Sequence, residues 1–405
     1  MARCLILALA LVAVVLPTVR AEEGSVIATM DELRFSPPKE KGTAELVPGK
    51  AGQAVRFRWE KESPSVFFTS NIRGTPEWDR AAGFSFWVQG DGSDSLGGLQ
   101  FIYDNDYAVR YDFAFPIKGT GWTKVKVAWE DLVPVLPGAN SRPLGGPDGN
   151  LPSRLSGLWF GKWWYWRDYP AHSFTVDEIR LEPKIVRDTR DYRPTGRPLA
   201  RVLRKLKAGQ PLTVVTMGDS LTDFRHWANR QVSWPNLLKE QVATKYRSEV
   251  TLENSAMGGT QLRQNLVLIP RWLARKPRPD LVTTYFGGND WEAGMRGEQF
   301  YQTCVDAIDR VRRATGGSAD VLLITTNPSA TNWKTMAELA EACRRAARDR
   351  RAGLADTEAA FHTAGREKPD HLFVDDRVHL SPAGHTLVAE TVLRALETGG
   401  QAAGK

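Results

Sequence analysis

Hydrophobic and polar residues alternate over short stretches in the first half of the chain, from about residue 25 to residue 183. The clearest stretches are residues 55–59 (Val-Arg-Phe-Arg-Trp) and 123–127 (Thr-Lys-Val-Lys-Val), and turn-forming clusters such as residues 90–94 separate them. A period of two without a helical period is typical of short antiparallel strands, so we predict a β sandwich. The predicted strands are 54–59, 65–70, 83–89, 99–103, 108–115, 123–129, 157–164 and 173–181.

The pattern changes after about residue 205. Apolar strands now alternate with segments of helical period, which predicts a parallel sheet covered by helices on both faces. Functional residues in such folds gather at the carboxyl ends of the strands. The predicted strands are 212–217, 250–254, 281–286 and 320–325, and the predicted helices are 234–246, 262–274, 298–315, 335–350 and 382–397.

The first residues have the features of a secretory signal peptide. Arg3 precedes an apolar run at residues 5–16, and Val19 and Ala21 stand at the minus-three and minus-one positions of an expected cut. The alternative is a membrane anchor, but the run is shorter than the roughly 20 residues that span a bilayer. We therefore expect a secreted or periplasmic protein with no membrane span once the signal peptide is removed.

These patterns divide the chain into two domains, as its length of 405 residues also suggests. The segment before the second domain is charged, contains Pro194 and Pro198, and is typical of a linker that runs into a short helix. We expect a signal peptide at 1–21, a sandwich at 22–184, a linker at 185–205, a parallel-sheet domain at 206–398 and a tail at 399–405.

Charge and cysteine content change this picture little. The formal charge is +7, and it falls to +5 when residues 1–21, with Arg3 and Arg20, are removed. The densest basic group, at residues 344–351, lies near the end of a predicted helix and is typical of a solvated face, so we do not expect nucleic acid as a partner. Cys304 and Cys343 also lie in predicted helices. One disulfide and two buried free thiols both fit them.

Four short polar motifs stand at the strand ends or before the last helix, where functional residues would converge. The last motif runs into Ser381-Pro382, a cap followed by proline at the first helical position. The motifs are residues 218–223 (Gly-Asp-Ser-Leu-Thr-Asp), 254–260 (Asn-Ser-Ala-Met-Gly-Gly-Thr), 287–290 (Gly-Gly-Asn-Asp) and 376–379 (Asp-Arg-Val-His). A serine and a histidine at such positions are the nucleophile and the base that hydrolytic acyl transfer needs.

In this order the motifs resemble the blocks of the SGNH (GDSL) hydrolase superfamily, over about residues 212–396. The resemblance implies a three-layer, flavodoxin-like α/β domain with Ser220 as nucleophile, His379 as general base and Asp376 as the carboxylate that orients it. It also implies an oxyanion hole made by the backbone N–H groups of Ser220 and Gly259 and the side-chain amide of Asn289. No cofactor and no metal are implied.

The residues themselves agree with these roles but leave alternatives open. A spacing of three lets one loop turn Asp376 back onto the imidazole of His379. Asp375 competes with Asp376 for this position, Gly258 competes with Gly259, and Ser220 could merely cap a helix. A metal site at His371, Asp375, Asp376 and His379 is a further alternative without a recognised ligand motif. The nucleophile elbow of α/β-hydrolases is excluded as the better match, because it needs glycine where this chain has Thr222.

Residues near the mouth of the site are candidates for substrate binding. They are Trp291, directly after the third motif, and Trp333, in the loop that follows the fourth predicted strand of the parallel sheet. Either side chain could simply pack. Asp219, Asp223 and His385 are expected to have structural roles.

The first half resembles galactose-binding-like, jelly-roll carbohydrate-binding modules. The resemblance rests on residues 84–88 (Phe-Ser-Phe-Trp-Val), on Gly121-Trp122 and on the closing residues 176–181 (Val-Asp-Glu-Ile-Arg-Leu). An aromatic cluster at residues 163–166 could face sugar rings, although alternate members would point into the sandwich. The order of the two halves resembles the layout of carbohydrate esterase family 2.

Together these resemblances imply a serine esterase that removes small acyl groups, most simply acetyl, from a polysaccharide or oligosaccharide. Two alternatives remain open at this stage. The same motifs serve lipolytic and lysophospholipid esterases. The chain could also be a non-catalytic glycan-binding protein, although it retains Ser220, Asn289, Asp376 and His379.

Overall fold

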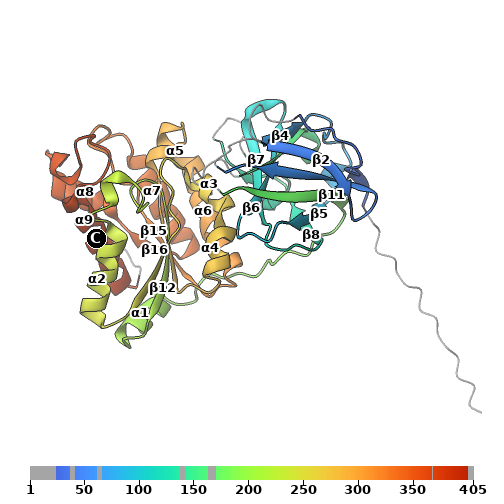
Figure 1. The fold of residues 1–405 in the computed structure, drawn as a ribbon. Helices are drawn as coiled ribbons and strands as arrows, with labels where there is room; N and C mark the ends of the chain where they lie inside the picture. Colours follow the sequence, from blue (N-terminus) through green and yellow to red (C-terminus); the bar gives the residue numbers. More distant parts are fainter. Residues whose placement is uncertain are drawn as a thin grey trace, which may run out of the picture.

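The computed structural model describes residues 24–36, 42–61, 66–136, 142–162, 170–366 and 368–399. The expected signal peptide at 1–21, the aromatic cluster at 163–166 and most of the tail at 399–405 lie outside these residues. Figure 1 shows two bodies side by side, an all-β half drawn in blue to green and an α/β half drawn in yellow to red.

The N-terminal half consists of two antiparallel sheets, which confirms the expected sandwich class. One sheet has the order β2-β3-β11-β5-β8, with β1 paired to β11, and the other has the order β4-β10-β6-β7-β9. The strands of the first sheet are β1 (Val26–Ala28), β2 (Gly42–Pro48), β3 (Gln53–Trp59), β5 (Gly83–Gly90), β8 (Thr123–Ala128) and β11 (His172–Glu182). Those of the second are β4 (Val66–Thr69), β6 (Leu96–Tyr103), β7 (Asp106–Pro116), β9 (Val133–Pro134) and β10 (Leu155–Lys162).

Aromatic rings fill the space between these two sheets. Phe57 on β3 contacts Phe67, Phe160 and Phe174, with ring centroids 5.0 to 5.8 Å apart. Each ring removes a large apolar area from water, which is the main stabilising contribution in such a core. The alternation of apolar and polar residues in the sequence is therefore the alternation of inward and outward side chains.

The C-terminal half is built on a five-stranded parallel sheet. Its order, β13-β12-β14-β15-β16, is the flavodoxin-like order 2-1-3-4-5, so the predicted fold class is confirmed. The chain reverses direction across the sheet between β12 and β14, where ligands bind in such folds. The strands are β12 (Leu212–Gly218), β13 (Val250–Asn254), β14 (Leu281–Tyr285), β15 (Asp320–Ile324) and β16 (Gly353–Ala355).

Helices cover both faces of this sheet (Figure 1). Buried side chains of α1, α2, α8 and α9 form one apolar core with one face, and those of α3, α4, α6 and α7 form another core on the opposite face. The helices are α1 (Ala200–Lys207), α2 (Trp234–Tyr246), α3 (Leu262–Val267), α4 (Ile269–Arg275), α5 (Gly288–Glu292), α6 (Gly297–Ala314), α7 (Ala337–Arg350), α8 (Thr357–Gly365) and α9 (Pro382–Glu397).

The elements differ from the prediction in a few places. The helix expected at 262–274 is two helices, because Pro270 at the start of α4 cannot donate a backbone hydrogen bond to the preceding turn. The strands β1, β2, β9 and β16 and the helices α5 and α8 lie outside the predicted elements. Strands β1, β9 and β16 have three residues or fewer, too few for a hydrophobic period to show. Leu199, Val202 and Leu206 pack in the core of the parallel-sheet domain, so α1 belongs to that core although most of it was assigned to the linker.

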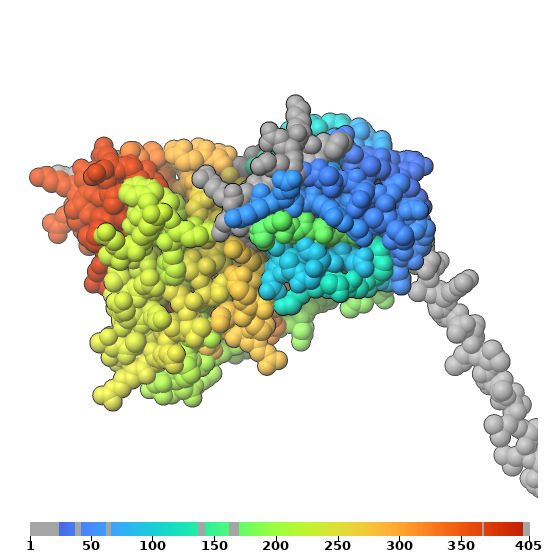
Figure 2. Space-filling view, viewed as in Figure 1, coloured from blue at the N-terminus to red at the C-terminus, as the bar shows by residue number. Residues whose placement is uncertain are grey.

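The two halves share a continuous buried contact, and the space-filling view shows them packed against each other (Figure 2). Val133 and Val135 of the sandwich lie in the same apolar cluster as Leu266 and Trp272 of α3 and α4. Arg310 on α6 donates from Nη1 to the carbonyl oxygen of Asp131 at 2.8 Å and from Nη2 to that of Glu130 at 3.1 Å. The sandwich is therefore attached to the helices on one face of the parallel sheet.

Within the described residues, none of the helices has both the length and the apolar composition for crossing a bilayer.

Candidate active site

Ser220 follows the carboxyl end of β12 in a tight turn. The carbonyl oxygen of Asp219 accepts hydrogen bonds from the backbone N–H groups of Thr222 (3.1 Å) and Asp223 (3.0 Å), which closes the turn. Gly218 is required there, because a Cβ at this position would lie 2.4 Å from Oγ1 of Thr222. The turn leaves Ser220 half-buried at the surface of the domain.

The loop before α9 carries the second part of the site. The backbone N–H of Val374 donates to the carbonyl oxygen of His379 at 2.8 Å, and that of Arg377 donates to the carbonyl oxygen of Val374 at 2.8 Å. Arg377 has a left-handed φ of 62°, which reverses the chain between Asp376 and His379. Ser381 then caps α9 by accepting from the backbone N–H of Gly384, as its sequence predicts.

These two segments bring Ser220, His379 and Asp376 into one hydrogen-bonded chain. Nε2 of His379 lies 2.9 Å from Oγ of Ser220, and Nδ1 of the same ring lies 2.6 Å from Oδ2 of Asp376. The other carboxylate oxygen of Asp376 accepts from the backbone N–H groups of Val378 and His379, each at 2.9 Å. Of the two candidate carboxylates, Asp376 and Asp375, the structure therefore places Asp376 against the imidazole.

The electrostatic environment keeps Asp376 ionised. Partial burial disfavours its charge, but the hydrogen bonds from the backbone and ring of His379 and from the backbone of Val378 outweigh this effect and hold its pKa below the ordinary value. An ionised carboxylate at Nδ1 places the proton of neutral His379 on that nitrogen. Nε2 is then free to accept the proton of Ser220.

The candidate oxyanion-hole groups lie around Ser220. The backbone N–H of Gly258 donates to Oδ2 of Asp223 at 3.0 Å, so it is already used. Gly259 has a φ of 75°, and nothing lies within 4 Å of a Cβ built on it, so the space where a side chain would lie is open. This geometry favours Gly259 over Gly258 as the donor. Nδ2 of Asn289 donates to the carbonyl oxygen of Thr260 at 3.1 Å, which fixes the amide at the start of α5 beside the same loop.

Two buried carboxyl groups, those of Asp219 and Asp290, lie near the Asn289 amide. Oδ1 of Asp219 accepts from the backbone N–H of Leu221 at 3.0 Å, and Oδ2 lies 3.5 Å from Nδ2 of Asn289. Oδ1 of Asp290 accepts from the backbone N–H of Leu262 at 3.1 Å. Burial raises the pKa of both Asp219 and Asp290 to about 7. Both hold loops that surround Ser220, which agrees with the structural role expected for Asp219.

Two aromatic residues outside the predicted motifs lie beside His379. The ring of His226 stacks on the ring of His379 with centroids 4.1 Å apart and an interplanar angle of 26°. Trp227 lies 6.0 Å from the same ring at 61°, and 55% of its surface is exposed. They follow Ser220 by six and seven residues, which was the available signal. A loop has no hydrophobic period, so the sequence does not reveal their contact with His379.

The two tryptophans proposed from the sequence as substrate-binding candidates both pack against other side chains. Trp333 is partly buried and packs against His362 and Phe373, with centroids 4.7 and 6.5 Å away. Trp291 is also partly buried in the core, beside the guanidinium of Arg296, which lies 4.7 Å from its ring. The structure therefore gives both side chains packing contacts.

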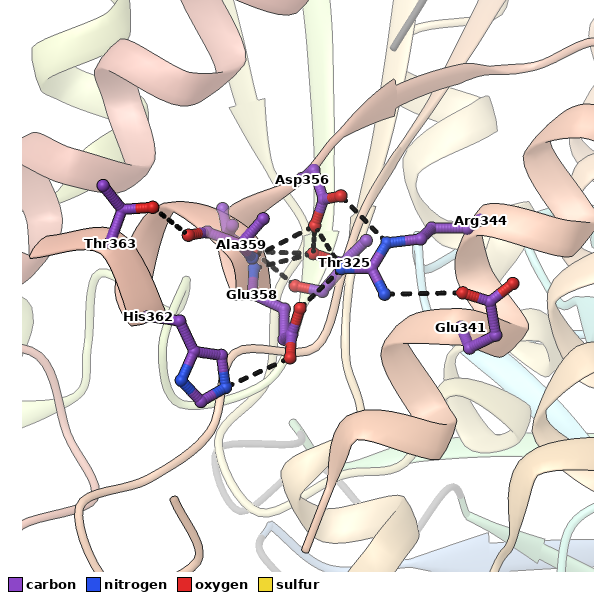
Figure 3. Close-up of polar contacts among 9 residues, drawn as sticks. Thr325, Glu341, Arg344, Asp356, Glu358, Ala359, His362 and Thr363 are labelled. Carbon is purple, nitrogen blue, oxygen red and sulfur yellow. Dashed lines mark hydrogen bonds and ion pairs between the residues drawn. The ribbon is translucent and has the colours of Figure 1, made fainter. Parts of the chain in front are cut away.

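A polar network holds the part of the domain against which Trp333 packs (Figure 3). Arg344 on α7 forms ion pairs with Asp356 at 2.8 Å and with Glu358 at 2.5 Å. Glu358 also pairs with Nε2 of His362 at 3.1 Å. The arginines of this helix, which the sequence assigned to a solvated face, thus include one that joins α7 to α8.

The remaining candidates do not join the site. Nδ1 of His371 contacts the carbonyl oxygen of Lys368, and buried His385 accepts from the backbone N–H of Trp234 at 3.3 Å. Among the described residues, no three His, Cys, Asp or Glu side chains are grouped so that they could hold a metal ion. Cys304 and Cys343 are buried free thiols with sulfur atoms 3.9 Å apart.

The solved structures that are similar to this chain align with about half of its residues. An acetylxylan esterase from Geobacillus stearothermophilus is 22% identical, with 47% of this chain and 96% of that chain covered and a TM-score of 0.39. A lipase/acylhydrolase from Enterococcus faecalis is 20% identical over 47% and 100% of the two chains, with a TM-score of 0.40. A two-domain esterase active on acetylated mannans is 24% identical over 50% and 53%, with a TM-score of 0.42.

No curated protein sequence matches this chain. The family model that does match, over residues 216–387, is that of the GDSL-like lipase/acylhydrolase family. The matched segment runs from the end of β12 into α9 and includes Ser220, Gly259, Asn289, Asp376 and His379. The C-terminal half of this protein thus contains a GDSL (SGNH) hydrolase domain.

Proposed function

We propose that this protein is a secreted or periplasmic serine esterase that removes small acyl groups, with acetyl as the expected group, from a carbohydrate. The observation that carries the proposal is the hydrogen-bonded chain from Asp376 through His379 to Ser220, with distances of 2.6 and 2.9 Å. No step of the proposed reaction needs a cofactor or metal.

The proposed reaction has two halves. Oγ of Ser220 attacks the carbonyl carbon of the ester while its proton moves to Nε2 of His379. The bond to the alcohol oxygen then breaks, and that oxygen takes the proton from His379 as the alcohol leaves. Water attacks the resulting acyl-enzyme, gives a proton to His379, and displaces Ser220, which recovers that proton as the carboxylic acid leaves.

The oxyanion that forms in each half needs hydrogen-bond donors. We assign this role to the backbone N–H groups of Ser220 and Gly259 and to the side-chain amide of Asn289. Support comes from the open space beside Gly259, from the use of the Gly258 N–H by Asp223, and from the hydrogen bond to Thr260 that orients Asn289. Donors held in place before the reaction stabilise developing charge without reorganisation.

Two features support a carbohydrate ester as the substrate. The hydrolase domain is joined through a continuous apolar contact to an antiparallel sandwich, whose sequence resembles carbohydrate-binding modules. The site is also open to solvent, because Asp376 retains 36% of its side-chain exposure and Trp227 is exposed beside His379. An ester on a large hydrated polymer can reach such a site.

Acetate release from acetylated xylan, pectin and other acetylated glycans tests this proposal. We expect the purified protein to release acetate from at least one of them, and the Ser220→Ala variant to release none while its thermal unfolding is unchanged. A series of nitrophenyl esters of increasing acyl length should show a sharp preference for acetyl. A preference for long acyl chains would instead indicate a lipolytic esterase. Absence of acetate release from every glycan would count against the carbohydrate assignment.

A further inference from the structure

Trp227 is held rigidly beside the candidate catalytic residues while its ring faces solvent. It begins a short 3-10 helix, Trp227–Asn229, whose buried Asn229 donates from Nδ2 to the carbonyl oxygens of Ser220 at 2.5 Å and Asp223 at 2.8 Å. The backbone N–H of His226 donates to the same Asp223 carbonyl at 3.0 Å. The loop that carries Trp227 is therefore tied directly to the nucleophile turn.

The exposure of this ring contrasts with the surroundings of the other large apolar side chains. Most tryptophans described above are packed in a core, whereas Trp227 exposes 55% of its surface. Val378, directly before His379, is also among the exposed apolar residues, at 42%. One exposed apolar side chain thus lies beside the ring of His379 in space, from the loop after β12, and a second directly precedes His379 in the loop before α9. Such a pair at the rim of a site is typical of a binding surface.

The chemistry of the reaction decides which part of the substrate this surface contacts. His379 must give a proton to the alcohol oxygen as it leaves, so that oxygen must lie within about 3 Å of Nε2. The acyl oxygen must instead face the oxyanion-hole donors. The ring of Trp227 lies 6.0 Å from that of His379, so a sugar whose leaving oxygen is at Nε2 is within reach of the indole.

We propose that Trp227 is the platform on which the pyranose ring bearing the ester lies. The flat face of an indole matches the C–H face of a pyranose, and the rigid attachment of the loop means that little conformational entropy is lost on binding. This inference rests on the proposed carbohydrate esterase function. It adds that alcohol selectivity, rather than acyl selectivity, is set at Trp227.

The test compares two acetate esters that differ only in the alcohol. The first is methyl β-xylopyranoside carrying one acetyl group, and the second is ethyl acetate. In Trp227→Ala we expect the ratio of kcat/KM for the sugar ester to that for ethyl acetate to fall about tenfold. Trp227→Phe, which keeps a flat ring, should recover most of the ratio. The ratio of acetyl to propionyl turnover on the same sugar should stay constant.

The matched control is Tyr107→Ala, which removes another aromatic ring of similar exposure, 54%, from β7 of the sandwich. We expect the ratio of this variant to equal that of the wild type. If Trp227→Ala leaves the ratio of the two kcat/KM values unchanged, Trp227 is not the platform. This holds if both kcat/KM values fall equally, as expected for a residue that only supports His379, and also if neither changes. A wild-type protein that hydrolyses ethyl acetate but no sugar acetate would reject the carbohydrate function itself, and the platform with it, before any variant is made.

Discussion

The imidazole of His226 covers one face of the imidazole of His379, with the two rings 4.1 Å apart and nearly parallel. Asp376 and Ser220 bind the two nitrogen atoms at the edge of the His379 ring. The ring is thus held by contacts at its edge and on its face. Partial burial, and then the neighbouring His379, lower the pKa of His226, so His226 is neutral at neutral pH and places no charge against the base.

We predict that His226 positions the base through this stacking contact. His226→Ala should lower kcat about tenfold, because the ring of His379 loses the contact on one face and spends less time in the reactive orientation. His226→Phe keeps a flat ring and should retain most of the activity. The measurement is kcat on a saturating acetate ester, with circular dichroism to confirm folding. Wild-type kcat in His226→Ala would contradict the prediction.

The two neighbouring carboxylates before His379 should differ in their importance. Asp376→Asn keeps the size of the side chain but removes the charge that selects the reactive tautomer of His379, so kcat should fall by about 10⁴-fold. Asp375→Asn is the matched control, because this exposed carboxylate is adjacent in sequence and the structure does not place it against the imidazole. Steady-state rates on one small acetate ester compare the two. Equal losses in both variants would refute the assignment of Asp376.

Removal of the Asn289 amide should affect the transition state more than the ground state. Asn289→Ala should lower kcat by about 10² to 10³ with a small change in KM, since the oxyanion forms only after attack. Asn332→Ala, in the loop after β15, removes an amide that contacts Thr335 instead and should leave kcat unchanged. A rise in KM at constant kcat for Asn289→Ala would show that Asn289 binds substrate without stabilising the oxyanion.

The stability of the sandwich should depend on pH through Asp112. Burial raises the pKa of this carboxyl to about 8, and Oδ2 has no hydrogen-bond partner among the described residues. Between about pH 4, the pKa of an unfolded aspartate, and pH 8, the folded protein keeps a proton that the unfolded chain releases. The contribution of Asp112 to the free energy of unfolding therefore decreases as the pH rises through this range.

Asp112→Asn removes this dependence while it keeps an oxygen to accept from Gln100, the partner of Asp112 on β6. The variant should gain stability relative to the wild type by up to about 1.4 kcal/mol for each pH unit between pH 4 and 8. Urea unfolding at several pH values measures the difference. A stability difference that is the same at all these pH values would contradict the predicted pKa shift.

Local patterns in the sequence predicted most of the architecture. The bounds predicted for α2 and α9 agree with the structure, because each helix has serine at its N-cap position and proline in its first turn. Only Ser381, before α9, makes a capping hydrogen bond with its side chain. The continuous apolar run of β12 likewise identifies a strand that is buried on both faces. The alternation of apolar and polar residues in β3 identifies a strand that is buried on one face. Capping and hydrophobic periodicity act within a few residues, so a single sequence shows them.

The sequence also determined which residue types were available for the chemistry, since the motifs supplied Ser220, Asn289, Asp376 and His379 in order. Only the tertiary structure decided how they meet. In the fold, Asp376 rather than Asp375 contacts the imidazole, and the N–H of Gly258 donates to Asp223. The rings of His226 and Trp227 lie beside His379. These relationships join segments up to about 150 residues apart, and they depend on loop geometry and packing, for which hydrophobic periodicity carries no signal.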